Sequence, residues 1–179
     1  VTDGDYILGL VERIRIDSHR LGHLNFKHKF EEHADEYLAE MEAYDKRGPG
    51  TVELNPDLHI PDYARHEFHN QPDGYVGSAF AGHIYNYGAA ARWASVQQDR
   101  EARNEKYAND VVAPSDDRVR RVLDQGCGVG HMTTGLRRRF PDAEVWGIDV
   151  SAPMVRYAHM LSVDAGQDVR YAQRLAEES

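Results

Sequence analysis

The sequence has little cysteine, no long apolar run and fewer basic than acidic residues. Cys127 is the single cysteine among 179 residues, which excludes a disulfide framework and favours a reducing compartment such as the cytoplasm. No run of 18 apolar residues occurs, so we expect no membrane span and no membrane partner. The first residues also lack the basic and then apolar pattern of a signal peptide. The net charge of −9 argues against nucleic acid as a partner.

The first part of the chain is predicted to be mostly helical. Apolar residues at helical spacing predict helices over 5–20 and 26–45, with Gly22 between them. Prolines and glycines predict irregular structure over 51–78. A further helix is expected over 79–108. These elements would form an N-terminal extension, residues 1–112, that serves as a lid or substrate-side region.

The pattern changes after residue 113, where short apolar strands alternate with helices. The strands are expected at 120–124, 144–148 and 169–173, and the helices at 131–140 and 152–165. Strand–helix alternation is typical of a parallel sheet with right-handed crossovers. The sequence therefore predicts an α/β, Rossmann-like domain over 113–179 with three strands present.

A glycine-rich turn between the first predicted strand and its helix carries the strongest functional signal. Asp124 ends that strand, and Gly126, Gly128 and Gly130 follow at every second position. Glycine tolerates the positive φ of a sharp turn and lets a ligand approach the backbone. Asp149 ends the next strand, 19 residues after Gly130, where an acid would accept hydrogen bonds from two ribose hydroxyls. Together these features indicate a cofactor that contains adenosine.

The acid that precedes the glycines bears on which cofactor is bound. Dinucleotide sites prefer G-x-G-x-x-G, and a pyrophosphate would be repelled by Asp124. The ammonium of a methionine moiety would instead pair with that carboxylate. S-adenosylmethionine is therefore favoured over NAD, and an NAD-dependent oxidoreductase stays open as an alternative.

The motif segments resemble class I S-adenosylmethionine-dependent methyltransferases, especially a bacterial group with helical N-terminal extensions that acts mostly on small molecules. The resemblance is carried by Asp124–His131, by Phe140–Asp149 and by Arg156–His159, and a weaker likeness covers Phe68–Tyr75. It implies methyl transfer to a small-molecule acceptor, with S-adenosylhomocysteine as the other product.

The resemblance also implies a role for each matching residue. Asp124, Gly126 and Gly128 would line the methionine half of the cofactor, Asp149 would hold the ribose, Val150 and Met154 would flank the adenine, and Ala176 would offer its backbone N–H to the adenine edge. One position departs from the family, because Leu175 stands where an Asp or Asn usually precedes that alanine. A contact to the adenine amino group is accordingly not expected.

The catalytic residues are not identified by the sequence. His69 has a side chain suited to general-base catalysis, and Tyr75, with Tyr85 and Tyr87, could form an aromatic lid near a sulfonium cation. These stay candidates beside core packing for the tyrosines. No metal is expected, because no cysteine joins the histidines.

The predicted strands do not make a whole methyltransferase sheet. We therefore expect the front part of a longer domain, truncated after the third strand. A non-catalytic S-adenosylmethionine-binding or interaction half-domain that needs a partner chain is a further alternative, and a homo-oligomer is possible.

Overall fold

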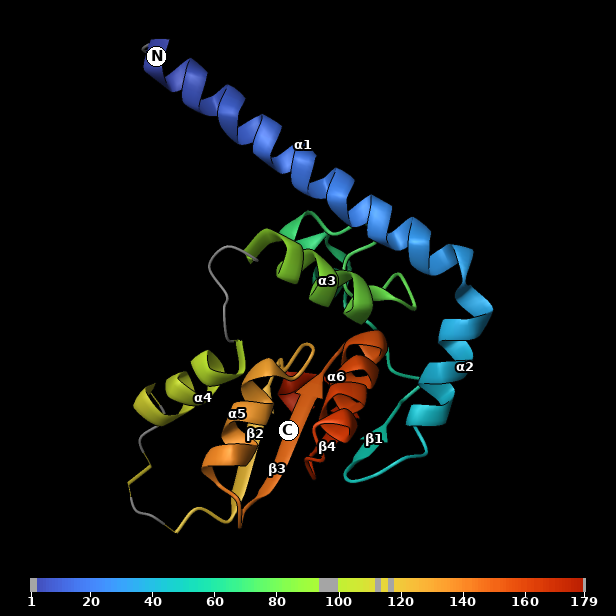
Figure 1. Cartoon of the computed structure of the whole chain (residues 1–179), viewed down its shortest axis with the longest axis vertical. Coiled ribbons are helices and arrows are strands. Elements are labelled where there is room, and N and C mark those ends of the chain that lie inside the picture. The colour runs from blue at the N-terminus through green and yellow to red at the C-terminus, as the bar shows by residue number, and fades with distance from the viewer. Residues whose placement is uncertain (1–2, 94–99, 112–113, 116–117, 179) are drawn as a thin grey trace.

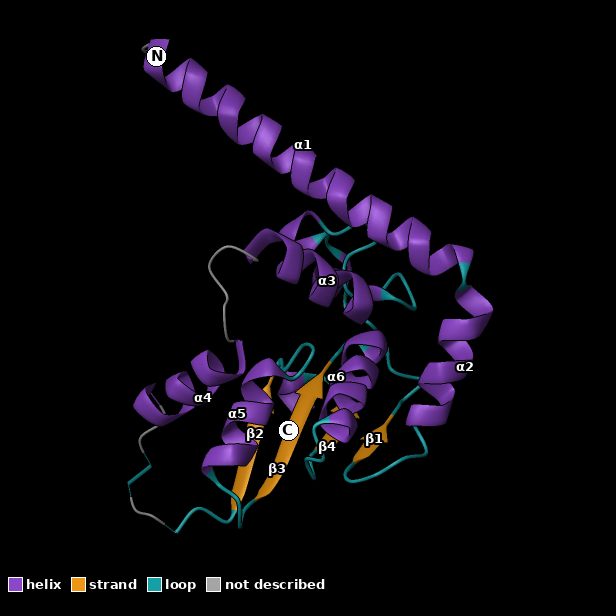
Figure 2. Ribbon diagram, in the orientation of Figure 1, coloured by secondary structure: helices purple, strands orange, loops and turns teal. Residues whose placement is uncertain are grey.

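The computed structural model describes residues 3–93, 100–111, 114–115 and 118–178 (Figures 1 and 2). The helices are α1 (Asp3–Glu32), α2 (Ala34–Tyr44), α3 (Ala81–Trp93), α4 (Arg100–Val111), α5 (His131–Arg139) and α6 (Ala152–Asp164), and the strands are β1 (Thr51–Glu53), β2 (Arg121–Gln125), β3 (Glu144–Asp149) and β4 (Arg170–Gln173). Within these ranges no helix has the length and apolar character that crossing a bilayer demands.

The strands form a parallel sheet in the order β1-β4-β3-β2. This confirms the α/β prediction, and β2, β3 and β4 lie where the three strands were expected. The fourth strand, β1, was missed, because a three-residue strand among prolines and glycines shows no periodicity. Thr51 pairs with Arg170, and Gly50, at φ 82°, allows the backbone to pass against Val169.

Helices α5 and α6 cover one face of the sheet, and α4 packs on α5 (Figure 2). The core between the sheet and α6 consists of Cys127, Val145, Val155, Ala158, Val169 and Tyr171. The opposite face is more open, since Leu123 on β2 is 46% exposed. On that face Arg170 and Arg174 lie over the ring of Trp146.

The helical extension packs against α6 through a second core. This core consists of Phe30, Met41, Phe80, Ile84, Val129, Met154, Tyr157 and Met160. Gly82 lets α3 approach α6 closely, because a Cβ at that position would lie 2.5 Å from Cβ of Tyr157. The extension is therefore packed directly onto the domain, while the N-terminal part of α1 projects away from it (Figure 1).

The helix boundaries expected around Gly22 were wrong. Gly22 does not end a helix, and α1 continues to Glu32 before α2 begins at Ala34. Buried His23 and Phe30, which follow Gly22, outweigh the roughly 1 kcal/mol that glycine costs inside a helix. Within the helix expected over 79–108 the described residues form α3 and α4, and the intervening residues 94–99 lie outside the described residues.

Candidate functional site

The loop from β2 to α5 is shaped by glycines with two different tasks. Gly126 and Gly128 have φ of 70° and 54°, and a Cβ at either position would meet no atom within 4 Å. Gly130, at φ 75°, is different, because a Cβ there would lie 2.5 Å from Oη of Tyr171. Gly130 thus serves internal packing, whereas Gly126 and Gly128 leave open space above the loop.

The loop is fastened to the end of β3. The backbone N–H groups of Gly126 and Cys127 both donate to the carbonyl oxygen of Ile148, at 2.8 and 2.9 Å. The backbone N–H of Gly128 donates to Oδ2 of Asp149 at 2.9 Å. The two parts of the sequence motif are therefore brought into direct contact, as the motif predicts for one site.

Asp149 holds the loop after β3 as well. Its Oδ1 accepts a hydrogen bond from the backbone N–H of Ser151 at 2.9 Å. Burial raises the pKa of the Asp149 carboxyl, and the two backbone N–H donors oppose that rise. Each carboxylate oxygen has one further lone pair for a ligand hydroxyl.

Asp124 lies beside this acid at the end of β2. Its Oδ2 accepts a hydrogen bond from Oγ1 of Thr133, 2.6 Å away. Burial is the main cause that raises the pKa of Asp124, and the charge of Asp149 adds to it. Two partly desolvated carboxylates beside an open glycine loop create a site that favours a cationic ligand.

Cys127 lies between the acids but is buried. Desolvation raises the pKa of its thiol, and the charges of Asp149 and Asp124 raise it further. The thiol is 9% exposed in the core and therefore has the character of a packing residue rather than a nucleophile.

A cavity of about 320 Å³ adjoins Asp149 on the side of the extension. It is lined by Tyr63, Ala64, Phe68, His69, Tyr75, Val76, Asp149 and Val150. Its wall is mostly aromatic, and the ring centroids of Phe68 and Tyr75 are 5.9 Å apart. The structure thus brings His69 and Tyr75 to the same cavity as Asp149 and Val150.

Contacts from both sides hold this aromatic wall. Nδ1 of His69 is hydrogen-bonded to the Tyr75 hydroxyl, and Ser151 Oγ donates to the carbonyl oxygen of Tyr75. At the rim, the Tyr63 hydroxyl donates to Oε1 of Glu177 at 3.0 Å. The extension and the end of the chain after β4 therefore meet across the cavity.

The segment that carries His69 is strained and is held by α1. His69 and Asn70 have φ of 53° and 58°, which is uncommon for residues other than glycine. The Asn70 carbonyl oxygen lies 3.3 Å from Nδ1 of His23, and Glu67 pairs with Arg20. Strain of this kind clusters at functional sites.

The remaining predicted residues lie at different depths. Met154 is 1% exposed and belongs to the core with Phe80 and Ile84, so its side chain does not line the cavity. Ala176 follows β4, and its carbonyl oxygen accepts a hydrogen bond from Nε2 of Gln125 at 3.4 Å. Tyr87 packs with Phe26 and Phe30 rather than at the cavity.

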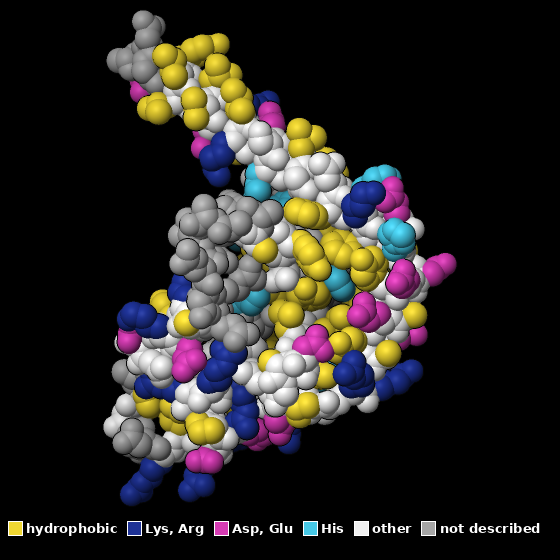
Figure 3. Space-filling view, in the orientation of Figure 1, with side chains coloured by type: hydrophobic (Ala, Val, Ile, Leu, Met, Phe, Trp, Pro, Cys, Tyr) yellow, Lys and Arg dark blue, Asp and Glu magenta, His cyan; other side chains and the backbone are white. Residues whose placement is uncertain are grey.

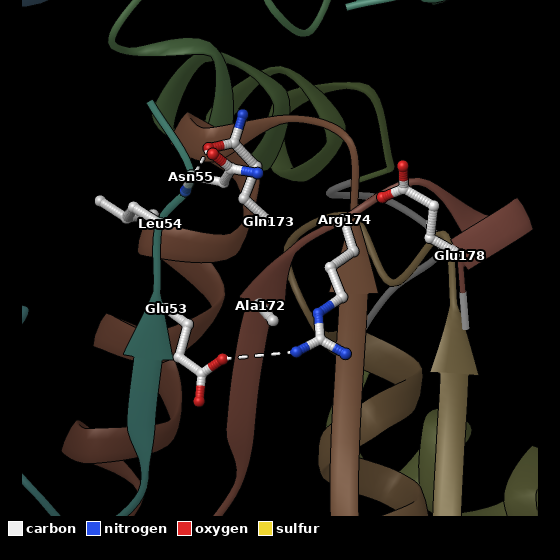
Figure 4. A pocket seen from close by; sticks show the side chains of 7 residues that line it. All are labelled: Glu53, Leu54, Asn55, Ala172, Gln173, Arg174 and Glu178. Carbon is white, nitrogen blue, oxygen red and sulfur yellow. Dashed lines mark hydrogen bonds and ion pairs between the residues drawn. The ribbon is translucent and has the colours of Figure 1, made fainter. Parts of the chain in front are cut away.

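A second, polar pocket of about 270 Å³ continues along the carboxyl ends of β4 and β1 (Figure 4). Gln173 is fixed there, because its Oε1 accepts from the backbone N–H of Asn55 and its Nε2 donates to the carbonyl oxygen of Val150. Arg174 reaches across to Glu53, with 3.6 Å between Nη2 and Oε2. Gln173 on β4 therefore holds the loop that follows β3 at Val150, on the side of β3 opposite the glycine loop.

Sequence reasoning did not identify Tyr63 as a site residue, and it placed Phe68 only in a segment of family likeness. Both line the cavity although they precede the glycine loop by more than fifty positions. The signal for them was the aromatic and proline-rich segment before α3, which had no motif of its own.

The comparisons with known proteins agree on the second part of the chain. Residues 122–179 match a family model described as "Methyltransferase domain". Trans-aconitate 2-methyltransferase of Rhodococcus jostii is 50% identical over 52 residues, which are 28% of this chain and 20% of that protein. The enzyme of the same name from Rhodopseudomonas palustris is 53% identical over 53 residues, again 28% and 20%. The matching segment thus spans about a fifth of the length of these curated relatives.

Solved structures show a more distant likeness. The plantazolicin methyltransferase BpumL, in complex with a pentazolic desmethylPZN analog and SAH, has a TM-score of 0.32 and 16% identity over 56% of this chain and 39% of its own. The PH0226 protein from Pyrococcus horikoshii OT3 has a TM-score of 0.31 and 23% identity over 64% and 39%. At these scores neither structure defines a ligand for this chain.

Proposed function

We propose that this chain, whose residues 122–179 match a family model described as "Methyltransferase domain", binds S-adenosylmethionine and takes part in methyl transfer to a small molecule. The observation that supports this best is the hydrogen-bonded contact between the glycine loop and Asp149. Gly126 and Gly128 leave open space where a Cβ would stand, and Gly128 is bonded to the acid. This geometry suits a nucleoside and an amino-acid moiety carried by one ligand.

Asp124, Gly126 and Gly128 would hold the methionine half. The carboxylate of Asp124 would pair with the ammonium group, and the glycines would let the ligand approach the protein backbone closely. Bound S-adenosylmethionine would supply an electrophilic methyl group on its sulfonium. A cation also relieves the mutual repulsion of Asp124 and Asp149, which contributes to the raised pKa of Asp124.

The adenosine half would occupy the cavity beside Asp149. Asp149 would accept hydrogen bonds from the ribose hydroxyls through its remaining lone pairs, and Val150 would lie against one face of the adenine. The aromatic residues Phe68 and Tyr75 offer the opposing apolar wall. A volume of about 320 Å³ lies within the range of small-molecule sites.

Two other residues have less direct parts in this proposal. Met154 would support the Val150 loop from the core, since its backbone N–H donates to Oγ of Ser151 at 3.2 Å. Ala176 would offer its backbone N–H to the adenine edge. Leu175 offers no polar side chain to the adenine amino group.

The acceptor is proposed to be a small molecule that enters from the side of residues 1–112. His69 and Tyr75 are hydrogen-bonded to each other at the cavity wall, so they are the candidate pair for positioning an acceptor or taking its proton. The relatives act on trans-aconitate by name, but the matched segment is the part expected to bind cofactor. The class of acceptor therefore rests on the wider resemblance. The buried thiol of Cys127 fits a cytoplasmic location.

Calorimetric titration with S-adenosylhomocysteine tests the proposal. Asp149→Ala should abolish binding, and Asp142→Ala, the same change at an exposed turn, should leave it intact. Titration with NAD should give no heat of binding. Absence of S-adenosylhomocysteine binding to the unsubstituted chain, or equal binding by Asp149→Ala, would refute the proposed site.

The aromatic wall needs its own variants. Phe68→Ala should weaken S-adenosylhomocysteine binding, because the adenine would lose its apolar wall, whereas Tyr87→Ala removes an aromatic ring that packs elsewhere and should not. If Tyr75→Phe changed neither cofactor affinity nor turnover, the lid role of Tyr75 would be excluded.

A further inference from the structure

The projecting part of α1 carries large apolar side chains that contact no core. The apolar stripe consists of Tyr6, Ile7, Leu10, Val11, Ile14, Leu21 and Leu24, which are 39% to 72% exposed. Apolar side chains gather along this end of the helix in Figure 3. A solvated helix normally carries polar residues at such positions, so the stripe indicates a surface that another element covers.

The stripe faces away from the rest of the molecule. His23 and Phe30 are 4% and 6% exposed, and they form the side of α1 that packs on the body. At about 100° per residue, Leu21 lies roughly 160° around the helix from His23. Leu10 and Ile14 share the side of Leu21. The described body of the same chain therefore cannot cover the stripe while α1 keeps its own packing.

We propose that the apolar stripe is an interface on which α1 of a second copy of this chain packs antiparallel. The stripe positions 7, 10, 14, 21 and 24 follow the alternating spacing of three and four residues that forms the seam of a helix pair. The same patch on both copies gives a closed two-fold contact. Position 17, the remaining seam position, is Asp17.

Asp17 decides the orientation. In a parallel pair the two Asp17 carboxylates would face each other across the seam. In an antiparallel pair with Leu10 opposite the partner's Leu21, Asp17 lies opposite the partner's Ile14 and beside the partner's Arg13. Arg13 already lies near Asp17 in its own helix, with 3.8 Å between Nε and Oδ2, so the same two charges can pair across the interface.

The buried area is sufficient for a dimer. An exposed aliphatic or aromatic side chain contributes about 100 Å² of apolar surface on burial. The seven residues of the stripe in each of two copies would then remove roughly 1,400 Å² from water, which is within the usual size of a stable interface. Most helical stability in proteins comes from packing of an apolar face, so the pairing would also stabilise the projecting end of α1.

The decisive experiment compares two leucines on the same helix by sedimentation equilibrium. Leu10 belongs to the stripe, whereas Leu8 is 69% exposed but lies about 160° from Leu10 around the helix. The unsubstituted chain should form a dimer, Leu10→Asp should weaken dimerisation by roughly tenfold or more, and Leu8→Asp should not. Asp17→Leu should tighten the dimer.

A monomeric unsubstituted chain, or equal effects of Leu8→Asp and Leu10→Asp, would overturn the proposal. Orientation is tested by disulfide formation between chains that carry Leu10→Cys and chains that carry Leu21→Cys. The mixture should cross-link, while Leu10→Cys alone should not, because in this register the two position-10 residues lie about 16 Å apart along the axis. Cross-linking of Leu10→Cys alone would refute the antiparallel arrangement.

Discussion

Asp124→Asn separates the two properties of the buried acid, its charge and its shape. An asparagine at this position can still accept the hydrogen bond that Thr133 Oγ1 donates at 2.6 Å. What disappears is a negative charge whose burial, together with Asp149, raises the pKa of Asp124. We therefore expect this variant to fold at least as well as the parent chain at neutral pH and to bind cofactor less tightly.

The loss of affinity follows from the proposed ammonium contact. A hydrogen bond to a charged group contributes about 1.5–3 kcal/mol, which corresponds to roughly 10- to 150-fold in the dissociation constant. Calorimetric titration with S-adenosylhomocysteine measures this change. Asp142→Asn, at an exposed turn, is the matched control and should bind like the parent chain.

The stability change has a definite dependence on pH. Because the folded-state pKa of Asp124 is raised, its ionisation favours the unfolded chain. The stability associated with the protonated acid is present below the unfolded pKa, near 3.9, and is lost as pH rises through the folded pKa. In thermal unfolding, the stability of Asp124→Asn relative to the parent chain should therefore increase as pH rises above about 4. Affinity within twofold of the parent, or a clear loss of stability at pH 7, would refute the reasoning.

The other residues of the site and its surroundings give further expectations. Gly128→Ala should lower the free energy of unfolding by about 1–2 kcal/mol through its positive φ. Gly130→Ala should lower it further, because its Cβ would clash with Tyr171. Equal losses of stability in thermal unfolding would contradict the packing role of Gly130. Cys127 should react slowly with a thiol reagent at pH 8 until the protein unfolds, and rapid native labelling would argue against burial. Burial lowers the pKa of His83 from 6.5 to about 4. The folded chain should therefore lose about 3 kcal/mol of stability as pH falls from 6.5 to 4, because only the unfolded chain then protonates this histidine. His83→Gln should make the unfolding free energy less dependent on pH in this range.

The elements near the motif could be predicted from sequence because their signals are local. The alternation of β2, α5, β3 and α6 is determined by patterns among neighbouring residues. The contact between Gly128 and Asp149 follows because parallel strands end at the same edge of the sheet. These relations need no knowledge of distant segments. The same local pattern identified the three glycines but did not distinguish the packing role of Gly130, because that role depends on contact with the distant Tyr171.

The parts that sequence reasoning missed depend on contacts between distant segments. The strand Thr51–Glu53 exists because β4 supplies an edge, and the cavity wall exists because α1 holds the segment around His69. Similarly, α1 runs through Gly22 because the tertiary burial of His23 and Phe30, which follow it, outweighs local propensity. Such effects are invisible in a window of a few residues.

The pairing of β1 with β4 also fixes an order of events during synthesis. Thr51 contacts Arg170, 119 positions further along the chain, so β1 leaves the ribosome well before β4, the strand with which it pairs. At 5–20 residues per second the wait is roughly 6–24 s. Throughout this interval β1 is without the strand with which it pairs. A pause in translation before residue 170 would prolong the exposure of that unpaired segment.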